Sequence, residues 1–76
     1  MNDERRKVIR ELVGKLEDLE AQIEDIVQEE TNYLDSMPEA FQDSEKGENT
    51  QETIATLENA QNTVPEVISY LEEACN

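Results

Sequence analysis

Carboxylates are the only chemically versatile side chains that are abundant in this sequence. Its 76 residues include 20 Asp and Glu, no His and a single Cys, Cys75. Without His the chain cannot form a Ser-His-Asp triad, use imidazole as a general acid or base, or offer it to a metal. One Cys excludes an intrachain disulfide and a thiolate zinc site. Any chemistry would therefore depend on the carboxylates alone.

The carboxylates do not form a recognisable catalytic or metal-binding pattern. The segment 43–48 begins like a calcium-binding EF-hand loop, but Gly47 stands at loop position five instead of six, and Ile54 stands where the bidentate Glu is needed. Pairs of Glu on bundled helices can hold two iron ions, but only together with a Glu-x-x-His element, which this chain lacks. No nucleophile is paired with a base. We therefore expect no enzyme activity, no cofactor and no metal.

The charge of the chain is large and unevenly distributed. The formal net charge of −14 argues against direct binding to nucleic acid or to an anionic membrane, because phosphate contacts need Lys and Arg. Residues 1–15 hold five bases and three acids, which gives +2, whereas the rest holds 17 acids and Lys46, which gives −16. A basic tip is thus followed by a strongly acidic remainder.

Apolar residues recur with heptad spacing in the first half of the chain. From Ile9 the steps alternate between three and four residues, and the a and d positions are Ile9, Leu12, Leu16, Leu19, Ile23 and Ile26. The stripe is widened at the e positions by Val13, Val27 and Leu34. This pattern predicts an amphipathic helix over 3–35, which begins at an N-cap at Asn2 or Asp3 and ends before Pro38.

A second stripe with the same spacing occupies the last third of the chain. Its core-type positions are Ile54, Leu57, Gln61, Val64, Ile68, Leu71 and Cys75. One edge is thickened by Ala60, Val67 and Ala74. Ser44 is the expected N-cap, and Pro65 predicts a kink because it lacks an N–H and clashes with a carbonyl one turn earlier. We therefore expect a bent helix over 44–75, joined to the first by a connection over 36–43.

The two stripes fit one all-α domain over 1–76, an antiparallel helical hairpin. A short connection makes the helices antiparallel neighbours, which sets Leu12 opposite Ile68 and Leu19 opposite Gln61. A hairpin of this size cannot cover so wide a stripe, so we expect two copies to pair as a homodimeric four-helix bundle. The residues expected in the core and the dimer are Ile9, Leu12, Leu16, Leu19, Ile23, Ile26, Ile54, Leu57, Val64, Ile68 and Leu71.

A dense run of acids accompanies the first stripe. Between Leu16 and Glu30 there are seven acids and no base. Spread over about 22 Å of helix axis, they give roughly one charge per 3 Å, close to the ~3.4 Å between phosphates of one DNA strand. A protein with a basic surface is the expected partner, and its expected contacts are Glu17, Asp18, Glu20, Glu24, Asp25 and Glu29. The alternative is a solvated face that only maintains solubility.

A series of short motifs follows the basic tip. In order they are Arg5-Arg6-Lys7, Leu16-Glu17-Asp18-Leu19, Glu29-Glu30-Thr31-Asn32-Tyr33, Met37-Pro38-Glu39-Ala40-Phe41-Gln42 and Ser44-Glu45-Lys46-Gly47-Glu48. This order is similar to that of small acidic helical proteins of bacteriophages and prophages, mostly of unassigned function, over about residues 4–60. Those proteins continue with an uninterrupted second helix, from which Asn62-Thr63-Val64-Pro65 departs. The resemblance implies a phage context, where small acidic proteins commonly inhibit host defence or nucleic-acid enzymes, sometimes by imitating DNA.

Two functions are compatible with these features. The first is a non-catalytic interaction protein that imitates DNA and inhibits a host nucleic-acid-binding or defence protein. The alternative is a structural or assembly module that docks on a partner helix through its apolar stripe. The sequence contains no apolar run long enough for a signal peptide or a membrane span, so the expected location is the cytoplasm, that of the host cell if a phage encodes the chain.

Overall fold

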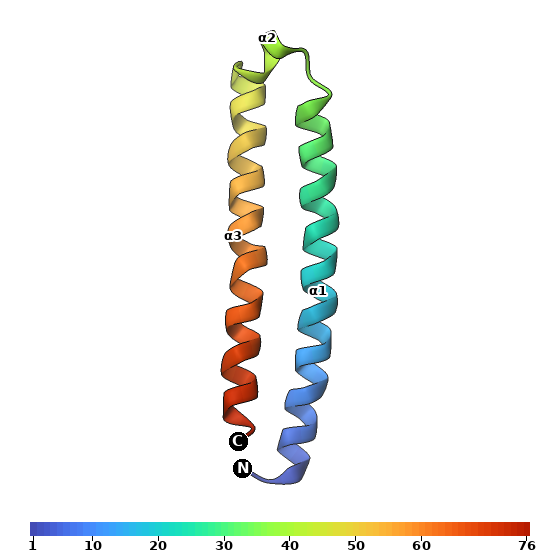
Figure 1. The fold of residues 1–76 in the computed structure, drawn as a ribbon, viewed down its shortest axis with the longest axis vertical. Helices are drawn as coiled ribbons and strands as arrows, with labels where there is room; N and C mark the ends of the chain where they lie inside the picture. Colours follow the sequence, from blue (N-terminus) through green and yellow to red (C-terminus); the bar gives the residue numbers. More distant parts are fainter.

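The computed structural model describes all residues 1–76 and contains only helices as regular elements (Figure 1). These are α1 (Asp3–Asp35), α2 (Glu39–Gln42) and α3 (Glu45–Ala74). The two long helices lie side by side and run in opposite directions, and both termini lie at the same end of a rod (Figure 1). The rod measures 58 × 15 × 11 Å. The prediction of an all-helical chain is confirmed.

Local capping interactions fix where the long helices begin. The Oδ1 atom of Asn2 accepts a 2.8 Å hydrogen bond from the backbone N–H of Arg5 at the start of α1. Ser44 Oγ accepts a 3.4 Å hydrogen bond from Gly47 N–H at the start of α3. Both side chains satisfy backbone donors that have no partner within the helix. Asn2 and Ser44 are among the N-caps that the sequence predicts.

The connection between the long helices brings two stretches of backbone very close together. Gly47, in the first turn of α3, is buried against the carbonyl groups of Phe41 and Gln42. A Cβ atom at Gly47 would lie 2.6 Å from the Phe41 carbonyl oxygen. The Gln51 side-chain amide donates a 3.1 Å hydrogen bond to the Gln42 carbonyl on the same segment. The absence of a side chain at Gly47 thus lets α2 pack on α3.

The inner face of α1 consists of its a and e positions. Its buried and half-buried residues are Ile9, Val13, Leu16, Glu20, Ile23, Val27, Glu30 and Leu34. The d positions Leu12, Leu19 and Ile26 are instead 42%, 49% and 45% exposed. The expectation that Leu12 and Leu19 face α3 within one chain therefore needs correction: e-position residues such as Val27 fill that place. The d residues form a row along one side of the hairpin.

The inner face of α3 follows the stripe read from the sequence. Its half-buried residues include Ile54, Leu57, Gln61, Val64, Ile68 and Leu71. The helix continues without interruption through Pro65, which is exposed. Pro65 therefore does not break α3, and the bend near it stays a prediction.

Very little of the single chain is fully shielded from water. Only three of 76 residues are buried, and Val27 is the one apolar side chain among them. Burial of apolar surface is the main stabilising term in folding, and small domains with so little of it usually gain stability from disulfides, metals or oligomerisation. The hairpin thus leaves much of its apolar surface available for contact with another protein.

Candidate functional site

The hairpin has two broad sides, one on each side of the plane that contains α1 and α3. Helical periodicity places the d row of α1 about 80° from its inner face and the corresponding edge row of α3 about 90° from its own, on the same side of an antiparallel pair. We call this side the apolar face. Its members are Leu12, Leu19, Ile26 and Tyr33 of α1, and Thr53, Ala60, Val67 and Ala74 of α3.

A contact between one member of the d row and α3 supports this placement. The Lys46 ammonium lies 5.6 Å from the centroid of the Tyr33 ring. Lys46 precedes Thr53 by seven residues, so it extends the edge row of α3, as Tyr33 belongs to the d row of α1. Side-chain hydrogen bonding with Tyr33, and secondly Coulombic attraction to it, raise the pKa of Lys46 above its ordinary value. Lys46 is therefore protonated at neutral pH.

The acidic residues of α1 keep their charges largely unneutralised. Of the six acids expected to bind a partner, five are exposed: Glu17, Asp18, Glu24, Asp25 and Glu29. Glu20 is half-buried on the inner face, because it occupies an e position. The molecule contains a single ion pair, between Arg6 and Asp3, so none of these six acids has a cationic side chain within reach.

One of these acids also contacts the opposite helix. The Glu24 carboxylate accepts a hydrogen bond from the Gln61 side-chain amide of α3. Glu24 lies on the far side of α1 from the d row, so this contact lies on the side of the hairpin opposite the apolar face. We call the exposed acids Glu17, Asp18, Glu24 and Asp25 the acidic face.

The basic tip is fastened to the end of α3. Arg6 forms a 2.9 Å ion pair with Asp3 and donates a 3.0 Å hydrogen bond from Nε to the Cys75 carbonyl. A cation at this position also interacts favourably with the negative end of the α3 dipole. Arg5 and Lys7 remain exposed. The tip therefore has free positive charge at the end of the rod where both termini lie.

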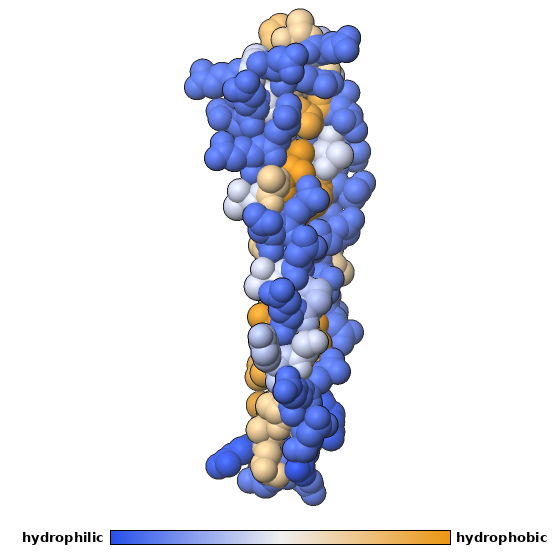
Figure 2. Space-filling model, turned by 60° about the vertical axis from the view of Figure 1, so that its left-hand side comes forward, coloured by the Kyte–Doolittle hydropathy of each residue, from blue (hydrophilic) through white to orange (hydrophobic).

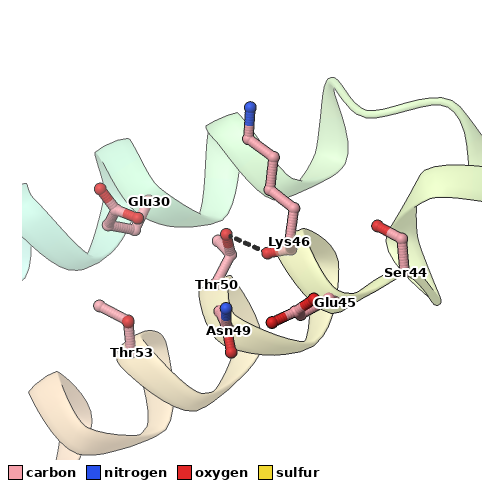
Figure 3. Close-up of a pocket in the computed structure, with 7 residues that line it drawn as sticks. All are labelled: Glu30, Ser44, Glu45, Lys46, Asn49, Thr50 and Thr53. Atoms are coloured by element: carbon pink, nitrogen blue, oxygen red, sulfur yellow. Dashed lines mark hydrogen bonds between the residues drawn. The ribbon is translucent and has the colours of Figure 1, made fainter.

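The largest hollow in the surface lies near the connection (Figure 3). It has a volume of about 540 Å³ and is lined by Glu30, Ser44, Glu45, Lys46, Asn49, Thr50 and Thr53. Thr50 donates a 2.9 Å hydrogen bond to the Lys46 carbonyl beside it, and the Lys46 ammonium points away from Glu30 (Figure 3). The apolar walls that are usual in small-molecule sites are missing here. No three acidic or thiol side chains converge on a point where a metal ion could bind.

Fold and surfaces together define an acidic helical hairpin with one apolar and one acidic face. Viewed from the α3 side, hydrophilic side chains cover most of the rod, and apolar side chains remain visible along it (Figure 2). The chain matches no known protein family, no curated protein and no solved structure. None of its helices has the length and hydropathy needed to cross a membrane.

Proposed function

We propose that this chain is a non-catalytic interaction protein whose acidic face binds a basic protein surface and competes there with nucleic acid. The observation that carries the proposal is the exposure of Glu17, Asp18, Glu24 and Asp25 without any cationic side chain to neutralise them. A partner built to bind phosphates offers Lys and Arg at a matching density. Such an interaction would be strong at low salt and weak at high salt.

The class of partner follows from this chemistry and from the resemblance to small acidic phage proteins. A host nuclease, defence protein or other DNA-binding protein has the required basic surface, and blocking it would benefit a phage. The proposed site of action is then the cytoplasm of the host cell. Because the acids lie on a rigid helix, their spacing is fixed before binding, which lowers the entropic cost of association.

The proposed active form is a homodimer in which two hairpins build a four-helix bundle. The exposed d row supports this form, because contiguous apolar surface on a soluble protein usually marks an interaction site. Pairing through the apolar face would leave the acidic face of each copy free. A bend at Pro65 would adjust the course of α3 along the bundle.

The same d row also supports a second candidate function, an assembly module that docks on a helix of another protein. In this case Leu19 and its neighbours in the row would contact the partner directly. Changes on the apolar face would then abolish function, whereas changes on the acidic face would be tolerated.

Reversal of the acidic face tests the first proposal. The variant E17K/D18K/E24K/D25K is expected to recover at least about tenfold less DNA-binding protein from a bacterial lysate at low salt, because four attractive contacts become repulsive. Recovery by the wild type should fall when duplex DNA is added as a competitor, and also when the salt concentration is raised. Circular dichroism should show unchanged helicity, since all four positions are exposed.

A matched variant controls for net charge. E52K/E58K/E66K/E73K reverses the same number of exposed acids, all on α3, and is expected to retain most of the binding. Equal losses in the two variants would show that only overall charge matters and would contradict a defined acidic face. Full binding by the α1 variant, together with loss on Leu19→Asp, would favour the assembly module.

A further inference from the structure

We infer that a second copy of this chain covers the apolar face, and that the two copies run antiparallel, with their connections at opposite ends of the dimer. The inference rests on the proposed homodimer and adds its interface, its register and its orientation. Within one chain the inner faces of α1 and α3 already contact each other, so the apolar face is the remaining surface that a second copy could bury.

The apolar face is large enough for a stable dimer. The broad side of the rod is 58 Å long and 15 Å wide, which is on the order of the 800 Å² per partner that a standard-size interface buries. Leu12, Leu19, Ile26 and Val67 on this side are each exposed to between 39% and 49% in the single chain. Their burial would add apolar contacts that the hairpin lacks.

The rows on this face have their midpoints in register. Leu19 is the central residue of α1 (Asp3–Asp35), and Ala60 lies at the centre of α3 (Glu45–Ala74). In an antiparallel pair with full overlap, Leu19 meets its own copy at the twofold axis and Leu12 meets the Ile26 position of the second copy. Ala60 also meets its own copy, and its small side chain permits close approach of the two α3 helices. The face is thus complementary to itself, as a twofold interface requires.

Charge complementarity selects the antiparallel orientation. It places the basic tip, residues 1–15, beside residues 23–37 of the second copy, which contain five acids and no base. Arg5, seven residues before Leu12, would then lie opposite the Tyr33 position of the second copy, where a cation–π contact can form. The opposite orientation would instead set these acids against the acidic first half of α3, where Lys46 is the only base. Like charges would then accumulate at one end of the bundle.

A distance measurement distinguishes the two orientations. Ala40 is exposed in the connection, so we would attach a spin label to the variant A40C/C75S and measure the separation of the labels by pulsed electron paramagnetic resonance. The antiparallel dimer predicts a separation comparable to the 58 Å length of the rod. A separation of less than about half that length would mean that the connections lie together and would overturn the orientation.

A pair of Asp substitutions tests the interface itself. Leu19→Asp places a charge at the proposed twofold axis and should shift the mass in light scattering from twice 8.7 kDa toward 8.7 kDa, with an at least tenfold weaker dimer. Ala21→Asp adds the same charge two residues away at an exposed position outside the apolar face and should remain dimeric. If Leu19→Asp unfolds, the label distances still decide the orientation.

The inference and the proposed function fail in different ways. A wild type that is helical and monomeric at micromolar concentration would overturn the dimer, whatever the acidic face binds. A stable antiparallel dimer whose acidic-face variant still captures the same DNA-binding proteins would leave the inference intact and contradict the proposed function.

Discussion

Replacement of Gly47 by Ala is expected to destabilise the protein by about 3 kcal/mol, at the upper end of the cost of overpacking a well-packed site. The added Cβ would lie 2.6 Å from the Phe41 carbonyl oxygen and still closer to the Gln42 carbonyl oxygen. These are backbone atoms, so no side-chain rotation relieves the overlap. Either α2 must move away from α3 or the first turn of α3 must unwind, and in both cases the connection loses its packing.

Gly14→Ala is the matched control, because the chemical change is identical. No atom outside the helix backbone lies within 4 Å of a Cβ at Gly14, which is exposed in the middle of α1. Ala is favoured over Gly in a helix interior, so this variant should gain about 0.5–1 kcal/mol. Urea unfolding followed by circular dichroism, at equal protein concentration, measures both changes. A Gly47→Ala variant as stable as the wild type would show that the connection is not closely packed.

The two glycines also show what sequence reasoning could not reach. Helix boundaries depend on local signals, so Ser44, Pro38 and the heptad spacing were sufficient to predict them. The need for glycine at Gly47 arises from the approach of backbone from another segment. Nothing in the sequence near Gly47 distinguishes it from Gly14, which also lies inside a helix.

The same distinction explains the error about the inner face of α1. A stripe that contains a, d and e positions can turn either its a and d or its a and e residues toward the second helix of its own chain. The periodicity locates the stripe but leaves this rotation open. In the structure Val13 and Val27 face α3, and Leu19 therefore lies on the outside. The sequence contained the clue in the width of the stripe, because a single neighbouring helix cannot cover three columns.

The acidic face was easier to predict than any other part of the candidate site. Residues at b and c positions of an amphipathic helix are exposed whichever way the stripe turns, so Glu17, Asp18 and Asp25 needed no tertiary information. Glu20 differs because it occupies an e position, whose exposure depends on the rotation of α1. The Arg6 contact with the Cys75 carbonyl joins residues 69 positions apart and required the structure.

Replacement of Pro65 by Ala is expected to stabilise the protein by about 1–3 kcal/mol. Pro65 lies inside α3 and cannot donate the hydrogen bond that the Gln61 carbonyl would otherwise receive. Ala restores this donor and removes the ring that collides with the preceding turn, a cost of about 3 kcal/mol in a helix interior. Part of the gain is lost because Ala also makes the unfolded chain more flexible than Pro does.

The measurement of Pro65→Ala has to include the dimer as well as the helix. Glu66→Ala, at the adjacent exposed position, is the control for a change in helix propensity and should alter stability by no more than a few tenths of a kcal/mol. If Pro65 only burdens α3, unfolding will require more urea and light scattering will show the same dimer. A variant with a more stable helix but a weaker dimer would show that the proline shapes α3 to fit a second copy. No gain in helix stability would mean that the helix already accommodates the proline without strain.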